Sequence, residues 1–306
     1  MYFSVLTVIY NNFDVTKDLV ESIFSTNYPY LNIVIIDNSI SQFNGIKKFE
    51  KKFKLNIINK VNQKKLKYNR NIYYFRSEKN IGYGAAINKA TDLVVKCNPE
   101  YLVILNNDTK VPKDFFLNIS SYLSEVKPLE NSLLSPIIKK TDDDSIWYAG
   151  GEINLVRCMG VHHNKISNKS YYETDFITGC CIICKPDTYQ QLGGFDEKYF
   201  LYYEDVDLSL QAKKKKIKIF ILSNLSIHHS IGVSTGGDNS QLTMYFSSRN
   251  RIYLMRKNFS SFVLYRFLCF FLINRIVKII ISFLTGNLKN IKFIILGIIR
   301  GLRIEI

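Results

Sequence analysis

The chain has 306 residues, of which 47% are hydrophobic and 14% aromatic, which is enough to bury a large core. Six cysteines in a chain of this length do not indicate a disulfide framework, so a reducing compartment is expected. The net charge is +15, and no acidic residue stands between Asp238 and Glu305. A basic surface can indicate a nucleic-acid partner, but these cations are interleaved with long apolar runs, so we expect none.

The first 110 residues alternate strand and helix patterns. Strands are expected at 3–10, 33–36, 72–75 and 101–105, and helices at 15–25 and 85–96. Strands joined by helices form a mostly parallel sheet, in which ligands bind beyond the carboxyl ends of the strands. The chain opens directly on the first strand, so no signal peptide is expected.

The following segment continues the mixed pattern. Strands are expected at 133–138, 176–184 and 217–222, a hairpin at 147–158, and helices at 114–123, from 186 to the glycines at 193–194, and at 206–216. We therefore expect an α/β fold whose mostly parallel central sheet is flanked by helices.

From residue 259 the pattern changes to largely apolar helices that carry a polar stripe. Polar side chains recur every three or four residues, namely Asn274, Lys278, Ser282 and Thr285, and then Lys289, Lys292, Arg300 and Arg303. This is typical of amphipathic helices that lie in a membrane interface, and no uninterrupted apolar run reaches the ~18 residues of a spanning helix. The alternatives are helices that pack on the preceding domain or that form a homodimer contact.

Polar residues follow the buried strand at 101–105. Asn106 and Asp108 are two residues apart, so their side chains share a face in extended chain. Such an oxygen pair suits Mg²⁺ or Mn²⁺ bridging a diphosphate, and the metal would neutralise charge on a departing nucleotide. Asn-Asn-Asp is also ordinary turn chemistry, so the motif alone leaves both interpretations open.

Two other segments follow strands of this half. Asp37 could accept a hydrogen bond from the imide N–H of uracil or thymine, the alternative being a cap or turn residue. Residues 80–84, which include Asn80 and Gly82, precede a helix whose amino terminus would favour phosphate. They match neither the dinucleotide-binding glycine fingerprint nor a phosphate loop, which disfavours dehydrogenases and P-loop enzymes.

Residues 192–208 bring carboxylates close to aromatic side chains; the four acids are Asp196, Glu204, Asp205 and Asp207. A sugar hydroxyl is a poor nucleophile at neutral pH, so transfer of a group onto it needs a general base. The alternative for each acid is to cap the helix that begins near Asp205. Downstream, residues 228–237 form a polar, glycine-rich segment in which a histidine could contact a metal or a diphosphate.

Taken in chain order, these segments resemble the family 2 glycosyltransferases of the GT-A fold, and in particular the rhamnosyltransferase-like branch of bacterial polysaccharide biosynthesis. The matching motifs lie at 8–12, 36–39, 80–84, 105–109, 193–208, 229–234 and 249–251. The resemblance implies contacts to the nucleotide or the donor sugar from Thr7, Tyr10, Asn11, Asp37, Asn80, Gly82, Asn106, Asp108 and Arg249.

The resemblance also implies the catalytic chemistry. Asn106 and Asp108 occupy the family's Asp-x-Asp position with Asn in place of the first Asp, so Asp108 is the main expected ligand of a divalent cation. His229 and Asn106 are expected as further metal ligands. Asp205 is the expected general base, with Glu204 as the alternative.

The resemblance implies an inverting transfer from a UDP- or dTDP-sugar, such as dTDP-rhamnose, to a lipid-linked saccharide acceptor in O-antigen or capsule synthesis. We expect 1–258 to be the catalytic domain, with 1–110 as its nucleotide-binding half and 111–258 as its acceptor half. Residues 259–306 would hold the enzyme peripherally on the anionic cytoplasmic face of the inner membrane. The rival hypothesis is a non-catalytic nucleotide-sugar-binding scaffold.

Overall fold

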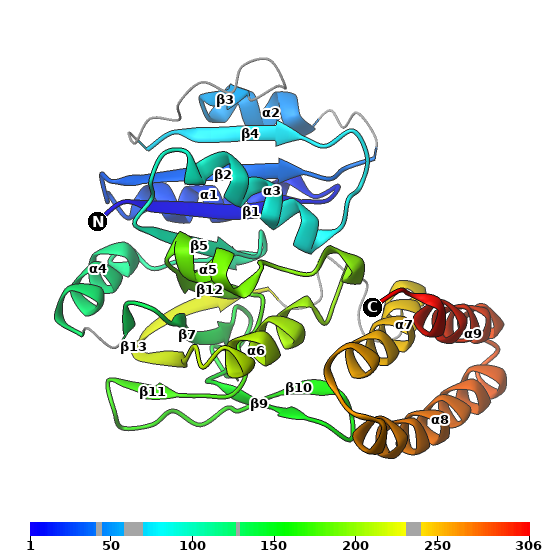
Figure 1. Ribbon diagram of the computed structural model, residues 1–306. Coiled ribbons are helices and arrows are strands. Elements are labelled where there is room, and N and C mark those ends of the chain that lie inside the picture. Colours follow the sequence, from blue (N-terminus) through cyan, green and yellow to red (C-terminus); the bar gives the residue numbers. More distant parts are fainter. Residues whose placement is uncertain (41–44, 58–69, 127–128, 231–239) are drawn as a thin grey trace.

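A computed structural model describes residues 1–40, 45–57, 70–126, 129–230 and 240–306 (Figure 1). The first half of the chain contains the elements β1 Phe3–Ile9, α1 Phe13–Ser25, β2 Leu31–Asp37, α2 Gly45–Lys52, β3 Leu55–Ile57, β4 Ile72–Arg76, α3 Tyr83–Val95 and β5 Tyr101–Leu105. The expected strands and helices of this half are confirmed to within a few residues. Elements α2 and β3 were not expected from the sequence.

The second half adds β6 Thr109–Lys110, α4 Phe115–Glu125, β7 Leu133–Lys140, β8 Ile146–Tyr148, β9 Gly151–Asn154, β10 Met159–His162, β11 Tyr171–Glu173, β12 Cys181–Cys184, α5 Pro186–Leu192, the 3₁₀ turn η2 Glu197–Tyr199, α6 Glu204–Lys214 and β13 Ile219–His229. Three helices end the chain: α7 Gln241–Asn258, α8 Ser261–Leu284 and α9 Leu288–Arg303.

One mixed sheet runs through both halves in the order β11–β13–β7–β12–β5–β1–β2–β4–β3. The strands β1, β2, β4 and β5 pair in parallel, and β12 joins the edge of β5 in the antiparallel direction. Every residue of β1 and β2 is buried, which is why these strands read as continuous apolar runs. The carboxyl ends of the parallel strands therefore meet at one edge of the sheet.

Each face of the sheet has its own core. Alternate residues of β1 point to opposite faces, so Val5 packs with α1 and α4 whereas Leu6 packs with α3, α5 and α6. Alanines at 85, 86 and 90 give α3 a slim buried side, which lets it pack closely against the sheet. The expected α/β architecture is confirmed.

Three expectations in the second half need correction. The strand expected at 176–184 is limited to β12, because the backbone N–H of Ile177 bonds the Ser209 hydroxyl at 3.1 Å instead of a neighbouring strand. The hairpin is formed by β9 and β10, while residues 146–148 pair with β7. The strand expected at 217–222 continues as β13 to His229, through a register shift between Leu222 and Ser226.

The polar stripe of α8 faces the protein rather than the surface. Arg275 and Ser282 are buried, whereas Ile273, Ile280 and Phe283 are 66%, 51% and 66% exposed. The sequence left open whether the polar stripe faces a membrane interface or the preceding domain; in the structure it faces the domain, and membrane association of 259–306 stays a prediction. By length and composition α8 could cross a membrane, with a mean hydropathy of 2.2 in its most apolar window.

The last helix, α9, packs against α7 (Figure 1). Two glycines make this contact close: a Cβ at Gly297 would lie 2.5 Å from the Tyr245 carbonyl oxygen, and a Cβ at Gly301 would lie 2.5 Å from that of Arg249. The expected domain border at 258 therefore runs between helices that are tightly packed. The outer surface of α9 carries exposed cations, namely Lys289, Lys292, Arg300 and Arg303.

Candidate active site

Asp37 lies at the carboxyl end of β2 and is 1% exposed. Its Oδ1 accepts a hydrogen bond from the Ser39 N–H at 2.9 Å, and the Tyr74 hydroxyl donates to its Oδ2. The Ser39 hydroxyl in turn accepts from the Asn11 N–H at 2.8 Å. Burial and the Asp37 carboxylate raise the pKa of Tyr74 far above its ordinary value, so this phenol remains a donor. The carboxylate is thereby fixed at the edge of the sheet.

The other residues expected around the nucleotide differ in exposure. Thr7 is fully buried in β1, and its hydroxyl has no hydrogen-bond partner among the described residues. Tyr10, just beyond the strand, is 42% exposed. Asn11 is exposed as well and has a φ of +57°, a left-handed conformation that asparagine tolerates better than most residues. Tyr10 and Asn11 thus offer open surface next to Asp37, and Thr7 does not.

Asn80 and Gly82 shape the amino terminus of α3. The Asn80 side chain accepts from the Gly82 N–H at 2.9 Å, and the Gly82 carbonyl accepts from the Asn38 amide at 2.9 Å. Gly82 has a φ of +88°, and a Cβ there would lie 2.5 Å from the Phe200 carbonyl oxygen. The next N–H, of Tyr83, donates to that same oxygen at 2.7 Å. Glycine is therefore required where α3 meets the segment that precedes α6.

Asp108 and His229 meet at the end of the sheet. Strand β6 pairs with β13 so that Thr109 lies opposite His229, which brings His229 Nε2 to 3.1 Å from Asp108 Oδ1. Both side chains are more than nine-tenths buried, and the Trp147 ring packs on the imidazole at 4.8 Å between centroids. His229 Nδ1 is buried with no hydrogen-bond partner among the described residues.

Asp108 and His229 offer two ligand atoms of the kinds that bind a divalent cation, but among the described residues no group of three or more His, Cys, Asp or Glu is placed to hold one. A carboxylate oxygen and an imidazole nitrogen at 3.1 Å from each other are ligands that Mn²⁺ accepts, whereas Mg²⁺ favours oxygen alone. Asn106, two residues before Asp108, is partly exposed, and its N–H donates to the Cys180 carbonyl at 3.0 Å. The middle residue, Asn107, is tied to α1 by a hydrogen bond to the Thr16 hydroxyl at 3.1 Å. Residues 231–234 of the expected histidine motif lie outside the described residues.

Glu204, which is buried, and Asp205, which is partly exposed, form an acidic pair in the first turn of α6. Burial and, to a smaller extent, the Asp205 charge raise the pKa of Glu204 to about 8. Burial also raises the pKa of Asp205, but the Gly179 N–H at 3.0 Å and the Val206 N–H at 2.8 Å stabilise its ionised form. Two backbone N–H groups thus favour the ionised form of Asp205, whereas among the described residues Glu204 has none of this support from another residue, and this difference favours Asp205 as the base.

Residues 179–180 connect the acidic pair to the segment that contains Asn106 and Asp108. The Gly179 N–H holds Asp205, and the next residue, Cys180, accepts from Asn106 at 3.0 Å. Burial raises the pKa of Cys180, and the charges of Asp108 and Asp205 raise it further. Residues 179–180 thus connect Asp205 to Asn106, which lies two residues before Asp108.

The backbone before α6 is held in an unusual conformation. Phe200, Tyr202 and Tyr203 have φ values of +65°, +67° and +74°, a region that costs energy for residues with side chains. Asn250 on α7 is 0% exposed, and its Nδ2 lies 3.0, 2.8 and 2.9 Å from three carbonyl oxygens of this segment, those of Tyr199, Leu201 and Tyr202. One amide therefore holds the turn that presents Glu204 and Asp205.

Arg249, next to it, also binds this turn. Its guanidinium donates to the carbonyl oxygens of Lys198 at 2.7 Å and Tyr199 at 3.1 Å. None of its described contacts is with Asn106 or Asp108, and its expected contact to a phosphate stays a prediction. The position of Arg249 shows it as a second support of the segment before α6.

The other two acids of this stretch are ion-paired. Lys257 Nζ lies 2.7 Å from Asp196 Oδ2 and 2.8 Å from Asp207 Oδ2. Burial would raise the pKa of Asp196, but hydrogen bonds from Lys257, the Lys198 N–H and Tyr253 hold it below the usual value. These carboxylates connect α6 and η2 to α7, which separates them from the acidic pair at 204–205.

Three residues around the site were not assigned from the sequence: Tyr74, Tyr83 and Trp147. Tyr74 reaches Asp37 because β4 lies beside β2 in the sheet, and strand neighbours cannot be read from one sequence. The Tyr83 hydroxyl donates a hydrogen bond to the Gly179 carbonyl at 3.1 Å, and Tyr83 lies within the motif at 80–84. Trp147 is the only tryptophan of the chain, which was a usable signal.

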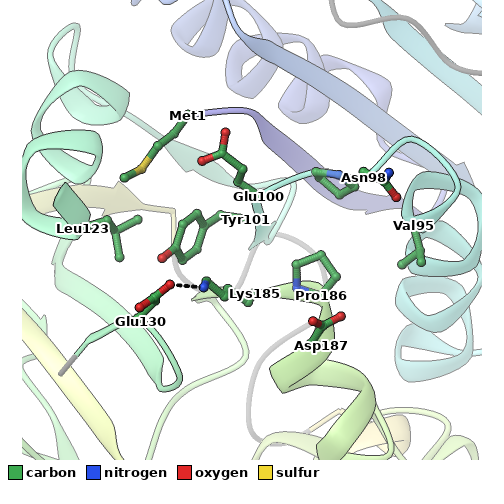
Figure 2. Close-up of a pocket in the computed structure, with 11 residues that line it drawn as sticks. Met1, Val95, Asn98, Glu100, Tyr101, Leu123, Glu130, Lys185, Pro186 and Asp187 are labelled. Atoms are coloured by element: carbon green, nitrogen blue, oxygen red, sulfur yellow. Dashed lines mark hydrogen bonds and ion pairs between the residues drawn. The ribbon is translucent and has the colours of Figure 1, made fainter. Parts of the chain in front are cut away.

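Two pockets border the sheet. One of about 410 Å³ is lined by Met1, Glu100, Tyr101 and Lys185 among others, at the amino-terminal ends of β1 and β5 (Figure 2). It lies at the edge opposite to Asp37 and Asp108 and contains none of the expected site residues. The other, of about 440 Å³, is lined by Asn80, Ala85 and Phe200 among others, and lies beside the amino terminus of α3.

A mixed sheet with buried acids at the carboxyl ends of its parallel strands defines an α/β protein of the GT-A type. Solved structures confirm the fold. GalNAc-T7, crystallised with UDP, GalNAc and Mn²⁺, has a TM-score of 0.62 at 16% identity and covers 84% of this chain and 48% of its own. Mannosyltransferase PcManGT from Pyrobaculum calidifontis, crystallised with GDP-Man and Mn²⁺, has a TM-score of 0.56 at 12% identity over 98% of this chain and 87% of its own.

Residues 4–192 match glycosyl transferase family 2, and the chain belongs to that family. It is similar to the low-salt glycan biosynthesis hexosyltransferase Agl10 of Haloferax volcanii, 23% identical over 197 residues, which are 62% of each chain. It is also similar to the N-acetylglucosaminyl-diphospho-decaprenol L-rhamnosyltransferase of Mycobacterium tuberculosis, 38% identical over 64 residues, or 21% of this chain and 20% of the relative. The resemblance drawn from the motifs is confirmed.

Proposed function

We propose that the chain is an inverting glycosyltransferase that moves a sugar from a nucleotide diphosphate onto a hydroxyl of a lipid-linked saccharide. The observation that carries this proposal is that residues 179–180 connect Asp205, through the Gly179 N–H, to Asn106, two residues before the Asp108 that meets His229. Asp108 and His229 offer ligands for a cation beside a diphosphate, and Asp205 offers a base. Single displacement needs both groups at the same substrate.

On the donor side, Asp37 would accept the imide N–H of uracil or thymine, because Ser39 and Tyr74 fix its carboxylate at the sheet edge. Tyr10 and Asn11 offer adjacent exposed surface. A UDP- or dTDP-sugar fits this acceptor, and the partial similarity to an L-rhamnosyltransferase makes dTDP-rhamnose the first donor to test. Asp108 and His229, with Asn106, would hold a divalent cation, which supplies positive charge for the leaving diphosphate.

On the acceptor side, Asp205 removes the proton from the attacking hydroxyl. The hydroxyl oxygen forms the new bond to the anomeric carbon while the bond from that carbon to the diphosphate oxygen breaks, and the configuration inverts. The nucleoside diphosphate leaves with the electron pair, and the proton stays on the acidic pair. Glu204, protonated because burial raises its pKa to about 8, keeps a second charge away from Asp205.

We further propose that 259–306 binds a membrane at its anionic cytoplasmic face. The outward side of α8 is apolar, and the neighbouring exposed side chains of α9 include the cations Lys289, Lys292, Arg300 and Arg303. This combination suits acyl chains next to anionic headgroups. The catalytic unit would then comprise 1–258, with the first 110 residues serving the donor and the remainder the acceptor.

The decisive test is a panel of UDP-, dTDP- and GDP-sugars with Mn²⁺ or Mg²⁺, measured by thermal shift and by donor hydrolysis. A bound donor raises Tm, and EDTA should abolish the shift. Asp205→Asn should retain the shift but lose at least about 100-fold in turnover, as expected when a general base is lost. The control is Asp187→Asn, an exposed acid in the first turn of α5, which should transfer normally.

Normal transfer by Asp205→Asn would contradict the assignment of the base. Metal-dependent donor binding without transfer or hydrolysis in the unaltered chain would instead identify a nucleotide-sugar-binding scaffold.

A further inference from the structure

Two arginines between α7 and α8 are buried without a counter-ion. Arg251 and Arg275 are 6% and 2% exposed. Among the residues that the structure describes, no carboxylate forms an ion pair with either guanidinium. A guanidinium keeps its charge when buried, so two of them side by side without an anion are strongly unfavourable. Such an arrangement is expected where an anionic ligand supplies the missing charge.

The existing contacts of the two guanidiniums are all with neutral groups. Arg275 Nη1 donates to the hydroxyls of Ser247 at 3.3 Å and Ser248 at 3.0 Å, and Arg251 donates to a backbone carbonyl of the β9–β10 turn. Both guanidiniums lie over the Phe271 ring, 5.6 and 5.1 Å from its centroid. The Nε atoms of both arginines are buried with no hydrogen-bond partner in the described part of the chain. Each guanidinium therefore has an N–H donor that no group in the described part of the chain satisfies.

The arginine pair lies near Tyr203, the residue that directly precedes the acidic pair. Burial raises the pKa of Tyr203 to about 12; the charges of Arg251 and Arg275 lower it, and the Asp205 charge raises it. The Tyr203 side chain is thus within electrostatic range of both arginines and of the proposed base. In the chain, Tyr203 also directly precedes Glu204 and Asp205, so the arginines lie on the acceptor side of the site.

The surroundings indicate how a ligand reaches this place. Tyr203, Ser247 and Asn274 border the pair and are partly exposed. Arg275 belongs to the polar side of α8, which faces α7, while the opposite side of α8 is apolar and exposed. A molecule whose tail lies in acyl chains along α8 could therefore place a charged headgroup between α8 and α7.

We propose that Arg251 and Arg275 bind the phosphate or diphosphate group that joins an acceptor saccharide to its lipid, a proposal that rests on the proposed function. Arginine is well suited to phosphoryl oxygens, because its planar fork donates several hydrogen bonds together with its charge. The similar rhamnosyltransferase carries "diphospho-decaprenol" in its name, which is an acceptor of this chemistry. The bound group fixes the saccharide so that its hydroxyl faces Asp205.

The test uses the full chain in detergent with EDTA, so that the cation site does not bind the probe. Inorganic pyrophosphate should raise the Tm of the unaltered chain by roughly 2–4 °C. Arg275→Gln and Arg251→Gln should lose this shift. Arg266→Gln, an exposed arginine on the same helix, should keep it. Asp108→Ala should keep it too, which separates this site from the donor site.

A second measurement ties the site to the acceptor. With a short-chain lipid diphosphate saccharide, Arg275→Gln should raise the acceptor KM at least about tenfold while leaving metal-dependent donor hydrolysis and the donor-induced Tm shift unchanged. Flotation of Arg275→Gln with phosphatidylglycerol vesicles should equal that of the unaltered chain. Loss of flotation with an unchanged acceptor KM would show a bilayer headgroup site and overturn the proposal.

Two further results would overturn it. One is a pyrophosphate-induced rise in Tm that persists in Arg275→Gln, which would show that Arg275 only links α7 to α8. The other is the absence of any pyrophosphate shift in the unaltered chain. Neither result depends on a nucleotide sugar, so each is distinguishable from a failure of the glycosyltransferase assignment, in which no nucleotide sugar would bind.

Discussion

The side chain of Asn250 offers the sharpest test of how the acidic pair is held. It is 0% exposed, and three carbonyl oxygens lie within 3.0 Å of its Nδ2. Asn250→Ala removes both N–H donors and leaves buried carbonyls without them, at about 1–3 kcal/mol for each lost bond. We expect the free energy of unfolding to fall by about 2–4 kcal/mol, which is a large part of an ordinary protein's stability.

The assay is urea denaturation together with sugar transfer. Without the amide, residues 200–203 can leave their left-handed conformations, so Asp205 shifts and kcat should fall while donor-induced stabilisation persists. Asn118→Ala is the control, since Asn118 lies on α4 and its amide bonds the exposed Asp114. It should change stability by less than about 0.5 kcal/mol. If Asn250→Ala unfolds like this control and transfers normally, the support of the turn by Asn250 is refuted.

Three other predictions concern the same site. Glu204 holds a proton in the folded chain up to a pKa of about 8 but releases it near 4.5 when unfolded, so stability should fall as the pH rises between these values; Glu204→Gln should flatten this slope in urea melts, and an unchanged slope would contradict the burial argument. Gly82→Ala should lower the free energy of unfolding by about 2–4 kcal/mol in denaturation, because the added Cβ would lie 2.5 Å from the Phe200 carbonyl oxygen and φ is positive. A loss below about 1 kcal/mol would show that the contact between α3 and residue 200 adjusts easily. His229→Ala should weaken the Mn²⁺-dependent shift of Tm with donor at least about tenfold in metal concentration, whereas the exposed His228→Ala should not; equal behaviour would remove His229 from the cation site.

The first half of the fold could be predicted because its signals are local. The strands of this half that carry site residues are buried on both faces and so appear as apolar runs, and the polar residues that follow them had to gather at one edge. That rule placed Asp37 and Asp108 correctly at the carboxyl ends. The acidic pair was found because a helix begins at Glu204, directly after several aromatic residues.

What the sequence did not show depends on contacts between distant segments. The meeting of Asp108 with His229 needs β13 to extend seven residues beyond Leu222 and to pair with β6, which a short strand pattern does not reveal. The inward direction of the polar side of α8 stayed open in the sequence, because periodicity gives a stripe but not its direction. Arg275 faces inward because α7 offers Ser247 and Ser248 as partners.

The close contact of α9 with α7 means that α9 supports the helix that holds the turn before Glu204 and Asp205. Gly297 and Gly301 let the backbone of α9 lie directly on the helix that carries Arg249 and Asn250. Shortening the chain before α9 would therefore loosen a turn that lies far away in the sequence, on the opposite side of α7.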